Sequence, residues 1–154
     1  MTTAWDEETA MTGGDHLIDD CIFCKILRGE IPSFKLFEDD RTLALMDINP
    51  INPGHCLTIP KYHAENLYAT PDEWLGYTMA TVRRVATAVN AVVKPDGINL
   101  LQANGPGAAQ SVFHLHVHVV PRLMNDGVGM NWEMVPGNMA AIGALAEKIA
   151  AAIE

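Results

Sequence analysis

Three of the six histidines in this chain stand at alternate positions of one apolar segment, at His114, His116 and His118. Because side chains alternate between the two faces of a β-strand, a strand over residues 111–121 would place all three imidazoles on one face and apolar side chains on the other. Neighbouring imidazoles on such a face would stand about 7 Å apart, close enough to act on one small ligand. The segment therefore predicts a half-buried strand that carries a binding or catalytic site.

Three interpretations fit this histidine segment. The histidines could be solvent-facing strand residues, although strict alternation of three disfavours this. They could begin a metal site, since neutral imidazole is a common zinc ligand, or one of them could be a nucleophile flanked by helpers. The preceding glycine-containing turn ends in Gln110 and Ser111 and offers backbone N–H groups and a hydroxyl, which suit phosphate oxygens. This neighbourhood favours attack on phosphorus.

A second group of reactive residues begins with Cys21 and Cys24, which have the C-x-x-C spacing of zinc sites. Three cysteines are too few, and odd in number, for a disulfide framework, so this pair indicates metal or redox chemistry in a reducing compartment. A tetrahedral site needs two further ligands, and His63 is one candidate. The alternative is a pair of unmetallated thiols with an exposed His63. We interpret the third cysteine, Cys56, as a small buried hydrophobe.

The composition limits what these groups can serve. With 154 residues, of which 49% are hydrophobic and 19% charged, the chain suits one soluble domain with its own core. The net charge of −9 comes largely from six acids within the first twenty residues, which hold no Lys or Arg. The rest of the chain is close to neutral. This argues against a nucleic-acid-binding face but leaves room for a small anionic nucleotide.

The chain also shows no targeting pattern. No segment has the length and apolarity of a membrane span, and the N-terminus lacks the pattern of a secretory signal, so we expect a cytoplasmic protein that binds no membrane. We predict an acidic mobile tail over residues 1–19, one domain over 20–124 and a C-terminal extension over 125–154. Alanines with apolar residues at helical spacing over 138–153 predict that the extension ends in a helix.

Hydrophobic periodicity and turn signals predict the other elements. Residues 22–27 have a short helix pattern that glycine and proline end. Thr70, Pro71 and Glu73 supply the N-cap, first-turn proline and capping-box signals of a long helix that runs to about residue 93. Strands are predicted over 33–38, 42–47, 55–59, 98–103 and 111–121. We therefore expect an α+β domain in which the long helix packs on an antiparallel five-stranded sheet.

The segment from Gln110 to Val120 resembles the signature of the histidine-triad nucleotide hydrolases and transferases, in which His-x-His-x-His is followed by apolar residues. The N-terminal C-x-x-C is similar to that of bacterial members of the Hint-like branch. Further segments that resemble this branch, in the same order, are residues 22–26, 30–32, 38–40, 46–48, 53–55 and 59–61. The resemblance covers about residues 20–122 and implies the α+β fold described above.

The resemblance also implies a role for each histidine. His116 would attack the α-phosphorus of a nucleotide and form a nucleotidyl-histidine intermediate that water then hydrolyses. The main-chain carbonyl of His114 would hold the other ring nitrogen of His116 and fix its tautomer. His118 and Ser111 would contact the phosphate or the leaving group, which completes the predicted catalytic set.

The nucleotide pocket implied by the resemblance draws on both halves of the chain. Asp47 would bind the ribose hydroxyls, and Asn104 and Gln110 would help to bind the phosphate. The other residues implied to line the pocket, each of which could instead be ordinary core, are Ile22, Phe23, Ile26, Ile31, Leu45, Ile48 and Leu57. Many relatives have glycine where this chain has Ala109, which narrows the room for a phosphate but should leave the N–H of that residue available.

The bacterial members imply zinc on Cys21, Cys24, His63 and His114, as a structural ion that the chemical step does not require. The implied activity is hydrolysis at the α-phosphate of small purine nucleotide derivatives, such as AMP or GMP phosphoramidates. Cleavage of dinucleoside polyphosphates and nucleotide binding with little turnover are the alternatives. Relatives pair the long helix and the fourth strand across a two-fold axis, so we expect a homodimer. His55 is expected either beside the three histidines or as a core residue.

Overall fold

The structure is a computed structural model of the chain and describes residues 16–129 and 134–154. Residues 1–15, which make up most of the predicted acidic tail, lie outside the described residues. The described chain contains three α-helices and one five-stranded sheet, in which every neighbouring pair of strands is antiparallel. The predicted α+β fold is confirmed.

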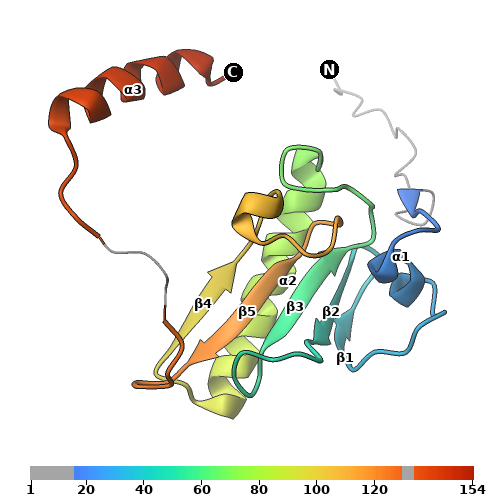
Figure 1. The fold of residues 1–154 in the computed structure, drawn as a ribbon. Coiled ribbons are helices and arrows are strands. Elements are labelled where there is room, and N and C mark those ends of the chain that lie inside the picture. Colours follow the sequence, from blue (N-terminus) through green and yellow to red (C-terminus); the bar gives the residue numbers. More distant parts are fainter. Residues whose placement is uncertain (1–15, 130–133) are drawn as a thin grey trace, which may run out of the picture.

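The elements follow one another as α1 (Ile22–Leu27), β1 (Lys35–Glu38), β2 (Thr42–Met46), β3 (Cys56–Pro60), α2 (Asp72–Val93), β4 (Gly97–Leu101), β5 (Val117–Arg122) and α3 (Met139–Ala152). The strands lie side by side in the order β1-β2-β3-β5-β4 (Figure 1). β5, which carries His118, is therefore an interior strand between β3 and β4. β1 and β4 form the two edges of the sheet.

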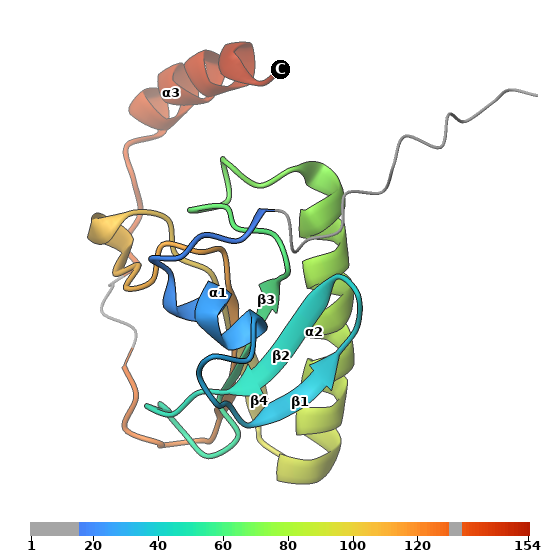
Figure 2. The same ribbon diagram turned by 90° about the vertical axis from the view of Figure 1, so that its right-hand side faces the viewer.

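The long helix α2 covers one face of the sheet (Figure 2). Its buried residues Val82, Val85 and Val89 recur at helical spacing and pack against side chains of β2, β3 and β5. This packing holds the strands that frame the histidine segment in one rigid layer. The helix ends at Val93 and is followed by the C-cap residue Lys94, which adopts the left-handed conformation with φ 51°.

The start of α2 differs from its prediction. The helix begins at Asp72, and the predicted cap residue Thr70 makes no capping hydrogen bond. The Thr70 hydroxyl instead donates to the carbonyl of Asn66, which leaves Pro71 as the residue that flanks the helix. Asp72 and Glu73 in the first turn still favour the helix N-terminus, because their negative charges face the positive end of the helix dipole.

The opposite face of the sheet is covered by α1 (Figure 2). Phe23, Cys24 and Ile26 of this short helix are buried against apolar side chains of β2 and β3. Burial of these side chains, rather than intrinsic helix propensity, keeps so short a helix in place. α1 therefore delivers both Phe23 and the C-x-x-C pair to the face of the sheet that carries the histidines.

The predicted strand over residues 111–121 is shorter in the structure. β5 begins at Val117, so His118 lies on a paired strand, opposite Leu57 of β3 and Leu101 of β4. His114 and His116 lie in the irregular segment that precedes β5. His114 and Leu115 are both buried, because neighbouring elements cover both sides of this segment. The two-residue alternation therefore did not predict which side chains would face solvent.

The C-terminal extension ends in the predicted helix α3, whose N-cap Asn138 accepts a hydrogen bond from the N–H of Ala141. Figure 1 shows α3 apart from the sheet, and no residue of this helix is buried. Its exposed apolar residues at helical spacing include Ile142, Leu145 and Ile149. Of the helices within the described ranges, none is both long enough and apolar enough to cross a membrane.

Candidate active site and metal cluster

The orientation of the buried His116 ring is fixed by the backbone. Its Nδ1 lies 2.7 Å from the main-chain carbonyl oxygen of His114, and because a carbonyl only accepts, Nδ1 carries the proton. Neutral His116 therefore holds its lone pair on Nε2. Burial lowers the pKa of His116, which keeps that lone pair free of a proton near neutral pH. Such a nitrogen can act as a nucleophile.

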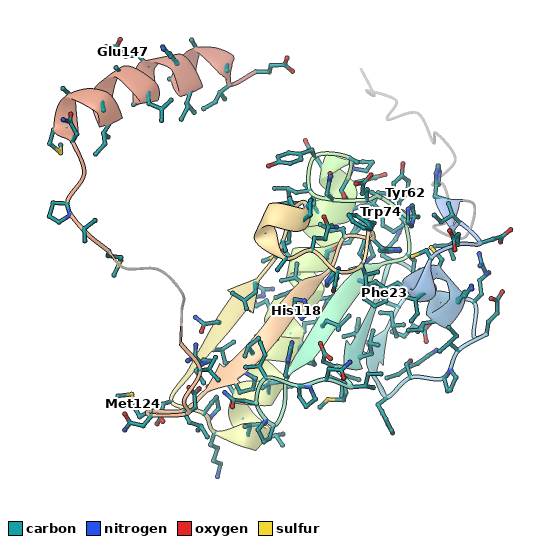
Figure 3. The ribbon with its side chains drawn as sticks, viewed as in Figure 1. Phe23, Tyr62, Trp74, His118, Met124 and Glu147 are labelled. Atoms are coloured by element: carbon teal, nitrogen blue, oxygen red, sulfur yellow. The ribbon has the colours of Figure 1, made fainter. Side chains whose placement is uncertain are left out.

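Phe23 holds two of the histidine rings in place. It reaches from α1 toward the sheet (Figure 3), and its ring centroid lies 5.1 Å from that of His116 and 5.8 Å from that of His114. Both contacts are edge-to-face, with interplanar angles of 76° and 80°. This geometry is favourable for aromatic pairs and limits rotation of the imidazoles. Phe23 therefore has a structural role here in addition to its predicted contact with the base.

His118 lies beside His116, with ring centroids 4.9 Å apart. On its other side, His118 Nδ1 lies 2.9 Å from Nε2 of His55, and Oδ2 of Asp47 lies 3.4 Å from that same Nε2. Burial lowers the pKa of His118 to about 4, with His116 and His55 acting in the same direction and Asp47 opposing. Of the two positions expected for His55, the structure shows the one beside the histidine segment.

The loop before the histidine segment is shaped by two predicted phosphate-binding residues. The buried side chain of Gln110 makes three hydrogen bonds, all to main-chain groups of this loop and its neighbour. The Asn104 amide accepts from the N–H of Leu67 and bonds to the side chain of Gln102. Both amides therefore hold the loop in shape. Ser111, by contrast, is exposed at the end of this loop.

Ala109 departs from many relatives, and the structure gives a physical reason for their glycine. Its φ of 61° lies in the left-handed region, where a Cβ is unfavourable and glycine is not penalised. The N–H of Ala109 donates to the carbonyl of Pro106 at 3.1 Å. The expectation that this N–H is available to a phosphate is therefore wrong, because a 3₁₀ turn over residues 106–108 already uses it.

The residues predicted to line the base pocket fall into two groups. Phe23 and Ile26 lie on the buried face of α1, whereas the side chains of Ile22 and Ile48 are 50% and 78% exposed. Asp47 lies near the surface with Oδ1 accepting from a main-chain N–H of its own turn, while Oδ2 faces the His55 ring. The remaining candidates, which pack in or against the same core, are Ile31, Leu45 and Leu57.

Four predicted metal ligands converge beside the histidine segment, with all donor atoms within 4.8 Å of one another. His114 Nδ1 lies 3.5 Å from Cys21 Sγ, 3.6 Å from Cys24 Sγ and 3.3 Å from His63 Nδ1. Cys24 Sγ lies 3.4 Å from His63 Nδ1. His114 Nε2 donates to the carbonyl of Pro60 at 3.0 Å, so its Nδ1 presents a lone pair to the cluster.

These spacings match a tetrahedral ion. Zinc bonds of about 2.3 Å to sulfur and about 2.05 Å to nitrogen place sulfur and nitrogen ligands about 3.5 Å apart, and two nitrogens about 3.3 Å apart. Burial raises the pKa of the Cys24 thiol to about 11, so a thiolate at this position needs a cation to neutralise it. The donor set and its geometry are compatible with zinc.

Two main-chain groups complete the site and could not be found from side-chain patterns. The Pro60 carbonyl fixes the tautomer of His114, and the N–H of Ile51 donates to Nδ1 of His55 at 3.0 Å. Every residue carries such groups, so the sequence holds no signal for them. A third feature, a cavity of about 420 Å³, lies between the metal cluster and the exposed Ser111, with Phe113 in its wall.

Comparisons with known proteins agree on one family. The family model described as HIT domain matches residues 28–125. The adenosine 5'-monophosphoramidase HNT1 of Saccharomyces cerevisiae is 40% identical over 147 residues, which are 95% of this chain and 90% of that protein. A crystal structure of a HIT family member from Bacillus subtilis has a TM-score of 0.83 and 39% identity, covering 88% of this chain and 99% of that one.

A further solved structure bears on the metal cluster. It is described as a zinc-bound histidine triad family protein from Mycobacterium smegmatis, with a TM-score of 0.68, 35% identity and coverage of 86% of this chain and 97% of that one. The family model spans most of the domain, and the relatives match over nearly their whole length. This chain belongs to the HIT domain family, as the sequence match, the shared fold and the three alternating histidines, His114, His116 and His118, together show.

Proposed function

We propose that this protein is a nucleotidyl hydrolase that cleaves purine nucleoside phosphoramidates at the α-phosphate through a nucleotidyl-His116 intermediate. The observation that carries the proposal is the 2.7 Å contact between His116 Nδ1 and the His114 carbonyl, because it directs the lone pair of a buried neutral ring onto Nε2. Membership of the HIT domain family indicates hydrolase activity and fits a histidine nucleophile, and the phosphoramidase activity named for the yeast relative supports this substrate class.

The geometry of His116 suits covalent catalysis. Nε2 forms a bond to the α-phosphorus as the phosphorus–nitrogen bond breaks, and the electron pair of that bond leaves with the amine, which takes up a proton from solvent. The ring keeps its proton on Nδ1 and becomes a cationic imidazolium, which the carbonyl of His114 stabilises through the existing hydrogen bond. Water then attacks phosphorus and loses a proton to solvent, the phosphorus–Nε2 bond breaks, and its electron pair returns to Nε2 as the nucleoside monophosphate is released.

The groups around His116 bind the rest of the nucleotide in this proposal. His118 and the exposed Ser111 contact the phosphate or the leaving group, and Asn104 and Gln110 act indirectly, by holding the loop that precedes Ser111 in shape. The base side of the pocket is formed by the exposed side chains of Ile22 and Ile48 and by the buried side chains of Phe23 and Ile26. The carboxylate of Asp47 forms the ribose side.

We also propose that zinc binds at Cys21, Cys24, His63 and His114. The ion would link α1 to the segment that precedes β5 and so stabilise the face of the sheet on which the nucleotide binds. Catalysis uses only the main-chain carbonyl of His114, so its ring is free to serve the cluster. The zinc-bound relative supports this assignment.

The protein is further proposed to act as a homodimer formed through α2 and β4. β4 is an edge of the sheet, and Leu100 on this strand and Met79 on α2 are exposed apolar residues that line one cavity. Leu100→Glu should yield a monomer in light scattering, because it places a charge in the proposed interface. Val92→Glu, on another surface of α2, should leave the dimer intact. A wild-type monomer would refute this assignment.

A substrate panel tests the proposed activity. Adenosine 5'-phosphoramidate, diadenosine tetraphosphate and a nucleotide sugar are compared with wild-type protein, His116→Ala and the control His16→Ala, whose ring contacts Tyr62 and lies outside the site. We expect the phosphoramidate to be the preferred substrate and His116→Ala to reduce its turnover about 10³-fold or more. Turnover by His116→Ala at the wild-type rate would refute the mechanism. Preference for diadenosine tetraphosphate would show that the substrates are dinucleoside polyphosphates and not phosphoramidates.

A further inference from the structure

We propose that His55 is a positioning residue that fixes His118 as a neutral imidazole with its proton on Nε2, so that His118 donates a hydrogen bond to the phosphoryl group and does not protonate the leaving group. The inference deepens the proposed function and rests on it for the identity of the bound phosphoryl group. It is carried by a chain of hydrogen bonds that begins at the main chain and ends at His118.

The first step fixes the tautomer of His55. The main-chain N–H of Ile51 donates to His55 Nδ1 at 3.0 Å, so Nδ1 must accept. A neutral imidazole has a single N–H, which therefore lies on Nε2 of His55. The ring is buried, and burial lowers its pKa, so the neutral form is the one present near neutral pH.

The second step decides between two acceptors for the Nε2 proton of His55. His118 Nδ1 lies at 2.9 Å, an ordinary hydrogen-bond distance, whereas Asp47 Oδ2 lies at 3.4 Å. The alternative, a proton on His118 Nδ1, would place two N–H groups head to head at 2.9 Å. It would leave His118 with Asp47 Oδ2 at 3.7 Å as acceptor, which is too long for a hydrogen bond. His118 Nδ1 therefore accepts from His55.

The third step follows for the opposite side of the His118 ring. With Nδ1 accepting, the single proton of neutral His118 lies on Nε2, which points away from His55. The side chain is 26% exposed and its ring lies 4.9 Å from that of His116, so this N–H is open to a ligand held at the nucleophile. Giving up that proton would leave an imidazolate, because Nδ1 carries none. His118 is therefore suited to donate to an anionic phosphoryl oxygen.

Histidine tautomers provide a test that does not require turnover. In protein labelled with ¹⁵N-histidine, with the His118 signals assigned from His118→Gln, we expect His118 Nε2 to be protonated and Nδ1 unprotonated between pH 6 and 8. The same spectrum should show protonated Nε2 for His55. A proton on Nδ1 of His118, or a doubly protonated His118 in this range, would overturn the inference whether or not the protein turns over a phosphoramidate.

Two substitutions of His55 separate positioning from a merely structural role. The amide of His55→Asn reaches the position of Nδ1 and can accept from Ile51 but cannot reach His118. The longer amide of His55→Gln reaches the position of Nε2 and can donate to His118, while the Ile51 N–H loses its acceptor. Of these two variants, only His55→Gln is expected to keep the wild-type tautomer of His118, with the proton on Nε2.

The kinetic counterpart uses adenosine 5'-phosphoramidate and the p-nitrophenyl ester of AMP, whose leaving group needs no proton. His55→Asn should lower kcat about tenfold for both substrates with KM little changed, because a donor to the phosphoryl group serves both, and His55→Gln should recover most of that loss. A loss confined to the phosphoramidate would assign His118 as a proton donor and overturn the inference. Equal losses in both variants would do the same. Failure of wild-type protein to cleave either substrate would count against the proposed function, and the tautomer spectrum would still decide the role of His55.

Discussion

Substitution of one buried cysteine at a time tests whether the four-residue cluster binds zinc. Cys24 and Cys56 are both fully buried, and burial raises the pKa of each thiol to about 11. Only Cys24 belongs to the cluster with Cys21, His63 and His114. Cys24→Ala and Cys56→Ala therefore remove the same atom from similar surroundings, at a cost of about 1 kcal/mol each in the metal-free protein.

The expected difference appears when zinc is added. With free zinc buffered at about 100 times the dissociation constant of the wild-type protein, binding stabilises the fold by about 2.7 kcal/mol. For a chain of this size, that free energy raises Tm by about 5–11 °C. If loss of one ligand weakens binding about 100-fold, the same zinc concentration gives only about 0.4 kcal/mol and a shift of about 1 °C.

The assay is thermal unfolding in a zinc buffer, with metal content measured on the purified proteins. Wild-type protein and Cys56→Ala should show the full rise in Tm and bind one equivalent of zinc, while Cys24→Ala should show neither. An equal rise in Cys24→Ala and Cys56→Ala would refute the four-ligand cluster. So would a wild-type Tm that does not respond to zinc.

Three further predictions test the fold and the chemistry. Gly54 has φ 91°, and a Cβ at this position would lie 2.8 Å from a Val93 methyl group. Gly54→Ala should therefore destabilise the fold by about 2–4 kcal/mol in denaturant titrations, because left-handed backbone strain adds to overpacking. The control Gly107→Ala places its Cβ in open space and should leave the stability nearly unchanged. The hydrogen bond from Arg122 holds the pKa of the Asp126 carboxyl well below its usual range. The charged carboxylate therefore stabilises the fold fully above a pH of about 4, and this stabilisation is lost as the pH falls. Asp126→Asn should lower Tm at pH 7 more than at pH 3. Burial lowers the pKa of His116, so its Nε2 takes up a proton only at a pH below about 6.5. The rate of nucleotide transfer from substrate to His116, followed by pre-steady-state kinetics, should therefore stay constant down to that pH and fall below it.

Much of the fold could be predicted because the relevant signals are local. The apolar spacing of α2 and the turn residues between strands depend on neighbours in sequence, and the structure has these elements close to their predicted ranges. The resemblance also indicated that Cys21, Cys24, His63 and His114 act together, and the structure brings their donor atoms into one cluster.

The differences arise where tertiary contacts override local patterns. His114 and Leu115 are both buried because elements distant in sequence cover both sides of their segment, so strand alternation cannot apply. Thr70 bonds to a nearby carbonyl and does not cap α2, although its sequence position suits a cap. Gln110 spends its side-chain hydrogen bonds on main-chain groups, one of them 45 residues away in sequence. No single-sequence pattern carries that information.

The most direct test of the central claim is to trap the covalent intermediate. Wild-type protein is mixed with adenosine 5'-phosphoramidate, quenched within one turnover and digested for mass spectrometry. The proposed mechanism predicts an adenylyl group on the peptide that contains His116, localised to that residue and absent in His116→Ala. Rapid turnover without any adduct, or an adduct on His114 or His118, would contradict the assignment of His116 as the nucleophile.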